Sequence, residues 1–335
     1  MNKKKLLLIS CKAWAFEYLK MSVIGAKIKD VTIILEKKDA KIDTFIKDNK
    51  LKYKVFILGG LKTTWIKKNI DYKNTLTICA ASAWIINSEI IKLFKKNIFN
   101  IHQSALPSFR GSVNSFVRLY NIRALQTTLH LVQKTIDTGK VVFYKDFYVD
   151  RKLVKPIEIN NYIQLENRKM LKEFLIDYFI LNKKLNYSEQ NNFFSSYQPR
   201  LKSEINGWID WSLNVNELDR FIGAFDDPYP GAKAMIHGKK VSLFDVDPSC
   251  VESSKHPFEN GMVIRKFMKK LVVAVNGGSL YISKVISGKK NIIEKIQPGD
   301  IFYSPKNKID LSKRRNLFLE KKNIYTKNNK IKKFI

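Results

Sequence analysis

The first half of this 335-residue chain repeats one pattern, in which a short apolar run rich in β-branched residues precedes an amphipathic segment. Buried parallel strands joined by helices produce this alternation. We expect an α/β, Rossmann-like domain with a mostly parallel sheet, closed by a long helix near residue 184. Its predicted strands are residues 4–10, 30–36, 54–58, 75–82, 97–102, 127–132 and 140–149, and its helices are 13–25, 40–50, 63–70, 88–96 and 157–184.

The composition changes after residue 184. Residues 185–213 are polar and read as a linker, and a short helix at 215–225 follows, capped by Asn214 or Asn216. Short strands then recur around turns at His237-Gly238 and Asn276-Gly277, in the ranges 234–246, 261–267, 269–286 and 300–304. The chain therefore divides into a domain at 1–184, a linker at 185–213, a small all-β, barrel-like module at 214–305 and a basic tail at 306–335.

Composition limits the classes of protein that this chain can belong to. It has no apolar run of the ~18 residues that a membrane span needs, so no membrane insertion is expected. Cys11, Cys79 and Cys250 form no C-x-x-C pair, which disfavours a disulfide framework or a zinc site. The basic and apolar start fits a buried first strand better than a signal peptide. These features indicate a cytoplasmic protein.

The formal charge of +31 would favour an anionic partner. Lys is much more frequent than Arg, however, and Asn and Ile are abundant. An AT-rich genome produces this composition in any protein that it encodes. We favour a generally lysine-coated surface, with a polyanion-binding surface or tail as the alternative.

Asn100 and His102 close the predicted strand at 97–102, and their side chains project on the same side because strand side chains alternate. Ligands bind outside the carboxyl ends of strands in an open parallel sheet. Asp137 lies in a turn between the next two predicted strands. Each residue alone has an ordinary structural explanation. Together they form a set in which an amide polarises a carbonyl, an imidazole moves a proton and a carboxylate orients or charges the imidazole.

These residues belong to spaced motifs. The chain reads Asn100-x-His102-x-Ser104-x-Leu106-Pro107, then Arg110-Gly111, then Ile136-Asp137-Thr138-Gly139. This set resembles the formyltransferases that use 10-formyltetrahydrofolate, among them methionyl-tRNA, glycinamide ribonucleotide and sugar N-formyltransferases. The segments TTLHLV, SAWIINSEI, GWIDWS, DPYPGA and HPFENG extend the resemblance over roughly residues 3–305.

The resemblance implies a role for each matched residue. Asn100, His102 and Asp137 would be catalytic: the amide would stabilise the oxyanion, the imidazole would take the amine proton, and the carboxylate would bias the imidazole and pass a proton to the leaving nitrogen. His130 is interpreted as a strand residue. No metal is required. The implied folate contacts are Ser82, Trp84, Ile85, Ile86, Ile136, Thr138 and Gly139, and the implied substrate contacts are Ser104, Arg110, Gly111 and Asn114.

The chain departs from the family pattern where the acceptor is expected. Ala105 replaces a Leu, Asn114 and Val117 replace a Pro and a Trp, and LISCKAW stands where methionyl-tRNA formyltransferases have F-A-G-T-P. We therefore expect residues 112–120 to select the acceptor. A nucleotide-linked amino sugar is favoured over methionyl-initiator tRNA, and a non-catalytic binding protein is the third alternative. The oligomeric state, a homodimer included, is left open.

Overall fold

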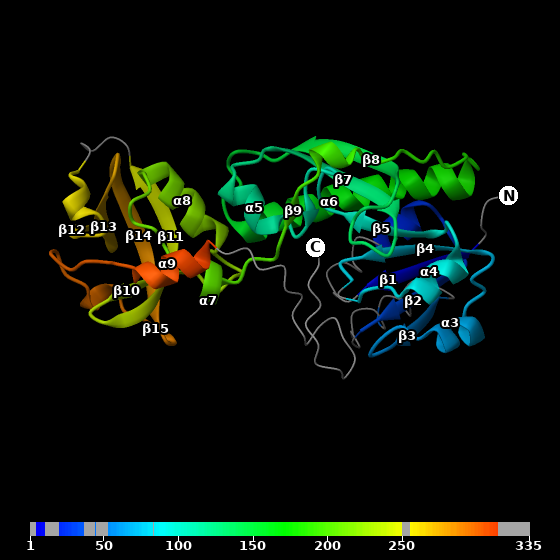
Figure 1. Cartoon of the computed structure of the whole chain (residues 1–335), viewed down its shortest axis with the longest axis horizontal. Coiled ribbons are helices and arrows are strands. Elements are labelled where there is room, and N and C mark those ends of the chain that lie inside the picture. The colour runs from blue at the N-terminus through cyan, green and yellow to red at the C-terminus, as the bar shows by residue number, and fades with distance from the viewer. Residues whose placement is uncertain are drawn as a thin grey trace.

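The computed structural model of the chain describes residues 5–10, 20–36, 44, 53–82, 84–249 and 255–313. Most of the predicted helices at 13–25 and 40–50, Cys11, Cys250 and the tail beyond residue 313 lie outside these residues. The described chain forms two large sheets at the two ends of an elongated molecule (Figure 1). They are joined by the region around α5 (Asn114–Leu119), β9 (Tyr197–Gln198) and α7 (Ser203–Asn206). No described helix has both the length and the apolar character needed to cross a bilayer.

The first sheet has the order β3-β2-β1-β4-β5-β7-β8. The first five of these strands are parallel, and β7 and β8 are antiparallel, so the predicted mostly parallel sheet is confirmed. The strand order reverses beside β1, which pairs with both β2 and β4, and ligands bind at such a reversal. The strands are β1 Lys5–Ser10, β2 Val31–Leu35, β3 Lys54–Ile57, β4 Thr75–Ala80, β5 Ile98–His102, β7 Ala124–Leu131 and β8 Val141–Tyr148.

Both faces of this sheet are buried, as its continuous apolar strands predict. Leu7 and Ile9 share a cluster with residues of α3 (Thr63–Asn69) and α4 (Ser88–Phe94). Leu6 and Leu8 share a second cluster with residues of α6 (Pro156–Leu175). The helix predicted to reach residue 184 continues as one π-helical stretch, η1 (Ile176–Ile180), and ends there. Asn182 follows in the left-handed conformation (φ 51°), which terminates helices.

The segment predicted as a linker contains regular structure that returns to the first sheet's loops. Strand β9 (Tyr197–Gln198) pairs in parallel with β6 (Arg110–Gly111), and η2 (Asn192–Phe194) precedes it. The short helix α5 (Asn114–Leu119) follows β6. The loop after β5 is therefore held on one side by a segment 87 residues further along the chain.

The second sheet is antiparallel, with the order β10-β11-β14-β13-β12 and β15 beside β14. Its hairpins turn at His237-Gly238 and Asn276-Gly277, as predicted. Residues 300–304, predicted as a strand, make only isolated pairings at Ile301 and Tyr303, which connect the two ends of the sheet. The elements are α7 Ser203–Asn206, α8 Val215–Ala224, β10 Ala232–Ile236, β11 Lys239–Ser249, η3 Pro257–Glu259, β12 Val263–Phe267, β13 Lys270–Val275, β14 Gly278–Ser287, β15 Lys290–Asn291, η4 Ile293–Lys295 and α9 Lys306–Ser312.

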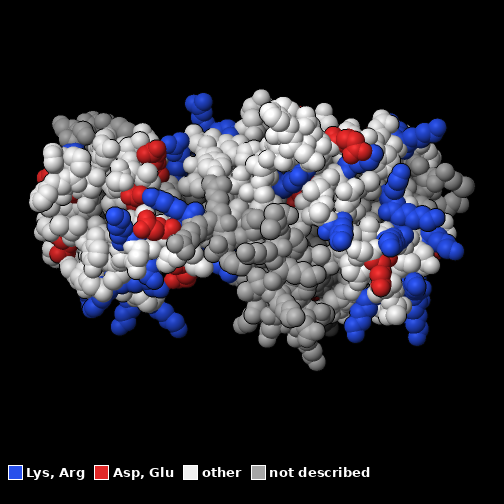
Figure 2. All heavy atoms as spheres, in the orientation of Figure 1, with Lys and Arg blue, Asp and Glu red and all other residues white. Residues whose placement is uncertain are grey.

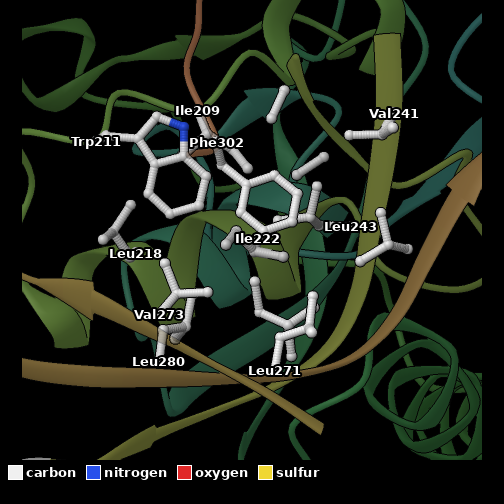
Figure 3. Packing of buried hydrophobic residues seen from close by; sticks show 14 of the residues in the cluster. Ile209, Trp211, Leu218, Ile222, Val241, Leu243, Leu271, Val273, Leu280 and Phe302 are labelled. Carbon is white, nitrogen blue, oxygen red and sulfur yellow. The ribbon is translucent and has the colours of Figure 1, made fainter. Parts of the chain in front are cut away.

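One face of helix α8 packs against the core of this module (Figure 3). Asn214 is its cap: the Asn214 side chain accepts from the Glu217 amide, and the Glu217 side chain accepts from the Asn214 amide. Leu218 and Ile222 of α8 lie in one cluster with Leu243 of β11. Trp211 and Phe302 stack with their ring planes at 18°, beside the same helix.

Candidate active site

His102 ends β5 with its side chain buried and fixed at one nitrogen. His102 Nε2 lies 2.6 Å from the carbonyl oxygen of Phe109, which also accepts a 2.7 Å hydrogen bond from Ser104 Oγ. Because a carbonyl oxygen can only accept, Nε2 carries a hydrogen, and in the neutral imidazole the lone pair is on Nδ1. His102 is 7% exposed. The nitrogen free to take a proton is therefore Nδ1.

Asp137 lies against that nitrogen. Its Oδ2 is 3.6 Å from His102 Nδ1 and accepts a 2.9 Å hydrogen bond from the Gly111 amide. Its backbone is left-handed (φ 54°) in the turn between β7 and β8, a conformation that non-glycine residues keep only where surrounding contacts hold it. The predicted partners His102 and Asp137 are thus in contact although 35 positions separate them.

The charge state of Asp137 follows from what surrounds it. Burial alone would raise the pKa of this carboxyl group. The nearby imidazoles of His102 and His130, together with the hydrogen bond from the Gly111 amide, outweigh burial and hold the pKa well below its usual range. Asp137 is therefore ionised throughout the physiological pH range. It favours a positive charge on an imidazole beside it.

His130, interpreted from the sequence as an ordinary strand residue, completes the cluster. Its Nε2 lies 3.2 Å from Asn100 Nδ2 and 3.5 Å from Asp137 Oδ1. Its Nδ1 lies 2.9 Å from the Leu131 carbonyl oxygen, so Nδ1 donates and Nε2 accepts one hydrogen from the Asn100 amide. Asn100 and His130 are direct partners in the β5–β7 pairing. If the register between β5 and β7 had been known, it would have placed His130 beside Asn100 and identified it as a site residue.

Two glycines are required by the close packing of the site loops. A Cβ on Gly111 (φ 91°) would lie 2.4 Å from the Gln198 carbonyl oxygen. A Cβ on Gly139 would lie 1.8 Å from the Leu131 carbonyl oxygen. Neither backbone atom can move without moving β9 or β7. The Arg-Gly and Asp-Thr-Gly motifs are therefore explained by two close backbone contacts.

The residues expected to contact folate lie on two loops. Ser82 Oγ accepts from the Trp84 amide at 3.1 Å in the loop after β4. Because β4 and β5 are adjacent and parallel, this loop and His102 share one sheet edge. Ile86 is buried among helix side chains and Ile85 is exposed. Ile136, Thr138 and Gly139 flank Asp137. Their contacts with folate remain predictions.

The residues expected to contact the acceptor have several protein partners. The Ser104 side chain is fully buried, and the Arg110 guanidinium donates to Gln190 and Asn192. Asn114 is half-buried and begins α5. Residues 115–118 are buried, and Arg118 Nη2 forms a 2.7 Å ion pair with Asp219 of α8. Residues 115–118 therefore pack between the two sheets, and the expectation that the segment 112–120 selects the acceptor stays a prediction.

This cluster can support acyl transfer to an amine. Nδ1 of His102 is a base with an ionised carboxylate 3.6 Å away. The Asn100 amide uses one hydrogen for His130, and the second is available to a carbonyl oxygen that gains negative charge. Among the described residues, no three His, Cys, Asp or Glu side chains gather in a metal-binding arrangement.

Comparisons with known proteins agree with this geometry. The sequence resembles methionyl-tRNA formyltransferase from Thermotoga neapolitana, with 29% identity over 172 residues, which are 50% of this chain and 52% of the relative. It also resembles the bifunctional polymyxin resistance protein ArnA of Wigglesworthia glossinidia brevipalpis, with 26% identity over 256 residues, 75% of this chain and 37% of the relative. The chain thus spans about half, or less, of these relatives.

A solved structure shares the fold over nearly its whole length. WlaRD, a sugar 3N-formyl transferase crystallised with dTDP and 5-N-formyl-THF, superposes with a TM-score of 0.61 at 21% identity, covering 83% of this chain and 96% of that one. Two family models match the sequence: Formyl transferase over residues 22–175, and Formyl transferase, C-terminal domain, over residues 202–300. Together these two models cover most of both sheets and more than half of the chain, and the chain therefore belongs to the formyltransferase family.

Proposed function

We propose that this protein transfers a formyl group from 10-formyltetrahydrofolate to a primary amine, most favourably the amine of a nucleotide-linked amino sugar. The observation that carries formyl transfer is the contact between His102 Nδ1 and Asp137 Oδ2 at 3.6 Å, next to the Asn100 amide, in a chain of this family. Asn100, His102 and Asp137 are the catalytic residues of this proposal.

The residues divide the chemistry among them. When bound, 10-formyltetrahydrofolate supplies the activated formyl carbon. Asn100 donates its second amide hydrogen to the formyl oxygen as negative charge develops there, an interaction typically worth ~3 kcal/mol of barrier. His102 Nδ1 takes the proton of the attacking amine, and Asp137 stabilises the resulting imidazolium. Asp137 also promotes the transfer of that proton from His102 to the folate nitrogen that leaves.

The donor set fits a folate that carries a formyl group. The loop 82–86 and the turn 136–139 both lie at the edge that contains His102, and they offer backbone groups and partly exposed apolar side chains for a flat ring. We assign the donor contacts to Ser82, Trp84 and Ile85 in the first loop, with Ile86 packing behind them. In the second loop we assign them to Ile136, Thr138 and Gly139.

Three observations support a small acceptor. Many cations of the second module are already paired with carboxylates, as in Lys240–Glu204 and Lys270–Asp247, which reduces the charge available to a polyanion. Figure 2 shows Lys and Arg spread over both ends of the visible face, with acidic side chains among them, and not as one continuous stripe. Beside the site, Nε and Nη2 of Arg110 donate to Gln190 and Asn192, which leaves Nη1 of the guanidinium for a diphosphate. A nucleotide sugar needs only a few such contacts.

Methionyl-initiator tRNA is the second candidate acceptor. It is favoured by the net charge of +31 and by the Thermotoga neapolitana relative, which is named as a methionyl-tRNA formyltransferase. A tRNA would require phosphate contacts along a longer path from the site than a diphosphate does.

One experiment separates the two acceptors. The full chain is incubated with 10-formyltetrahydrofolate and either a panel of nucleotide-linked amino sugars or charged initiator tRNA, and tetrahydrofolate release is followed at 50 and 200 mM salt. We expect turnover with an amino sugar and a weak salt dependence. Turnover with tRNA alone, falling by about 10³-fold or more in kcat/KM over this range, would establish the second candidate. No release with any amine would refute formyl transfer and leave a binding protein.

A further inference from the structure

Residues 188–198, called the strap below, form hydrogen bonds with the two loops of the site. These loops are the one that contains Arg110 and Gly111 and the turn that contains Asp137. At its start, Ser188 exchanges two 2.9 Å backbone hydrogen bonds with Val141. At its end, Ser196 O accepts from the Arg110 amide at 3.0 Å, and Gln198 O accepts from the Ser112 amide at 2.7 Å. The strap therefore touches the strand after the Asp137 turn and the loop after His102.

Gln190 of the strap connects these two loops through its side chain. Its Nε2 donates to the carbonyl oxygens of Asp137, at 2.9 Å, and Gly139, at 2.7 Å. Its Oε1 accepts from Nε of Arg110, at 3.1 Å, and from Nη2 of Arg110, at 2.7 Å. A primary amide has two donor hydrogens and two acceptor lone pairs, and all four are used here.

The contacts of Gln190 reach both partners of the catalytic carboxylate. Asp137 keeps a left-handed backbone, and two hydrogen bonds to its own and the Gly139 carbonyl hold that turn closed. Arg110 precedes Gly111, whose amide donates to Asp137 Oδ2, and follows Phe109, whose carbonyl fixes His102 Nε2. If Gln190 were lost, the two loops could move apart, and the 3.6 Å contact between His102 and Asp137 would lengthen.

We infer that Gln190 is a positioning residue that sets the distance between His102 and Asp137 by tying the Arg110-Gly111 loop to the Asp137 turn. The inference rests on the proposed function only for its kinetic test. The hydrogen bonds of Gln190 to the two loops are present whatever reaction the protein catalyses. Gln190 reaches the reaction through Asp137 and His102.

Three variants test this inference. Gln190→Ala removes both halves of the tie. Gln190→Glu keeps an acceptor for Arg110 and places a carboxylate oxygen, which cannot donate, against two carbonyl oxygens. The control is Glu189→Gln, one position away, which removes only the surface ion pair with Lys140 at a side chain that is 74% exposed. We expect kcat to fall about 10- to 100-fold in both Gln190 variants, with KM for the formyl donor within about threefold, and both constants within about twofold in the control.

Hydrogen exchange provides a readout that does not depend on turnover. In Gln190→Ala we expect faster amide exchange in peptides covering 105–112 and 133–140, and unchanged exchange in peptides covering 271–285 of the second sheet. Unchanged exchange at both loops, or a kcat within twofold of wild type, would overturn the inference. Faster exchange throughout the chain would also overturn it, by showing a general structural role. If wild-type protein turns over no acceptor, the proposed function fails, and exchange alone decides on Gln190.

Discussion

Replacing Asp219 with alanine removes the counter-ion of a guanidinium buried between the two sheets. Arg118 is 6% exposed, and its Nη2 lies 2.7 Å from Asp219 Oδ2. Its Nε has no hydrogen-bond partner within the described part of the chain, and the guanidinium lies against Gly223 of α8. After the replacement, the charge of Arg118 stays buried between α5 and α8 without its carboxylate partner.

The size of the effect follows from this burial. Removing one partner of a buried ion pair typically costs about 3–5 kcal/mol of unfolding free energy, because the remaining charge is uncompensated. In a chain of this size, this corresponds to a fall of the melting temperature by roughly 4–7 °C. Arg118→Met combined with Asp219→Ala removes both charges, and we expect the pair to cost much less than Asp219→Ala alone. The control is Asp247→Ala, which removes an exposed pair with Lys270 and should cost less than about 1 kcal/mol.

The assay is urea unfolding followed by circular dichroism, together with KM for the acceptor at a temperature where every variant is folded. We expect a large loss of stability and an unchanged KM, because the described structure places residues 115–118 between the two sheets. A loss below about 1 kcal/mol in Asp219→Ala would refute the reasoning. So would a raised KM at unchanged stability, which would support the prediction that this segment contacts the acceptor.

Three further outcomes are expected. His102→Ala should lower kcat by about 10²- to 10⁴-fold while circular dichroism shows an intact fold, and near-wild-type turnover would contradict the role of the imidazole. The pKa of Asp137 is lower in the folded than in the unfolded state, where it is about 3.9, so its ionised form stabilises the fold above about pH 4 and this stabilisation is lost as the pH falls further. The stability difference between wild type and Asp137→Asn should therefore shrink between pH 6 and pH 3 in urea titrations, and a constant difference would count against it. Gly139→Ala, whose Cβ would meet the Leu131 carbonyl, should lower stability by about 1–3 kcal/mol and reduce turnover, and an unchanged variant would show that the turn can relax.

The sequence predicted the features that depend on local pattern. The apolar runs of β1, β2, β4 and β5 identified the parallel strands, and the turn residues at 237–238 and 276–277 placed two hairpins. The sequence placed the side chains of Asn100 and His102 on the same side of β5, because strand side chains alternate with a period of two.

The features that were missed depend on contacts between distant segments. His130 lies in the site because the register of β5 against β7 places it opposite Asn100, and strand propensity does not determine that register. Gln190 lies in a polar stretch with no periodicity, and its role exists only where the chain returns to Arg110. The sequence did not predict the burial of Arg118, because an arginine in a short helix is ordinarily exposed to solvent.

The strap at 188–198 changes where this chain can be divided. A catalytic fragment ending at residue 184, as the change in composition suggests, would keep Asn100, His102 and Asp137 and lose Gln190 and β9. A hybrid enzyme that borrows this domain, or exchanges its second module for that of a relative, should join after Gln198. The functional boundary of the catalytic unit then lies 18 residues beyond Ile180, where its last helical segment ends.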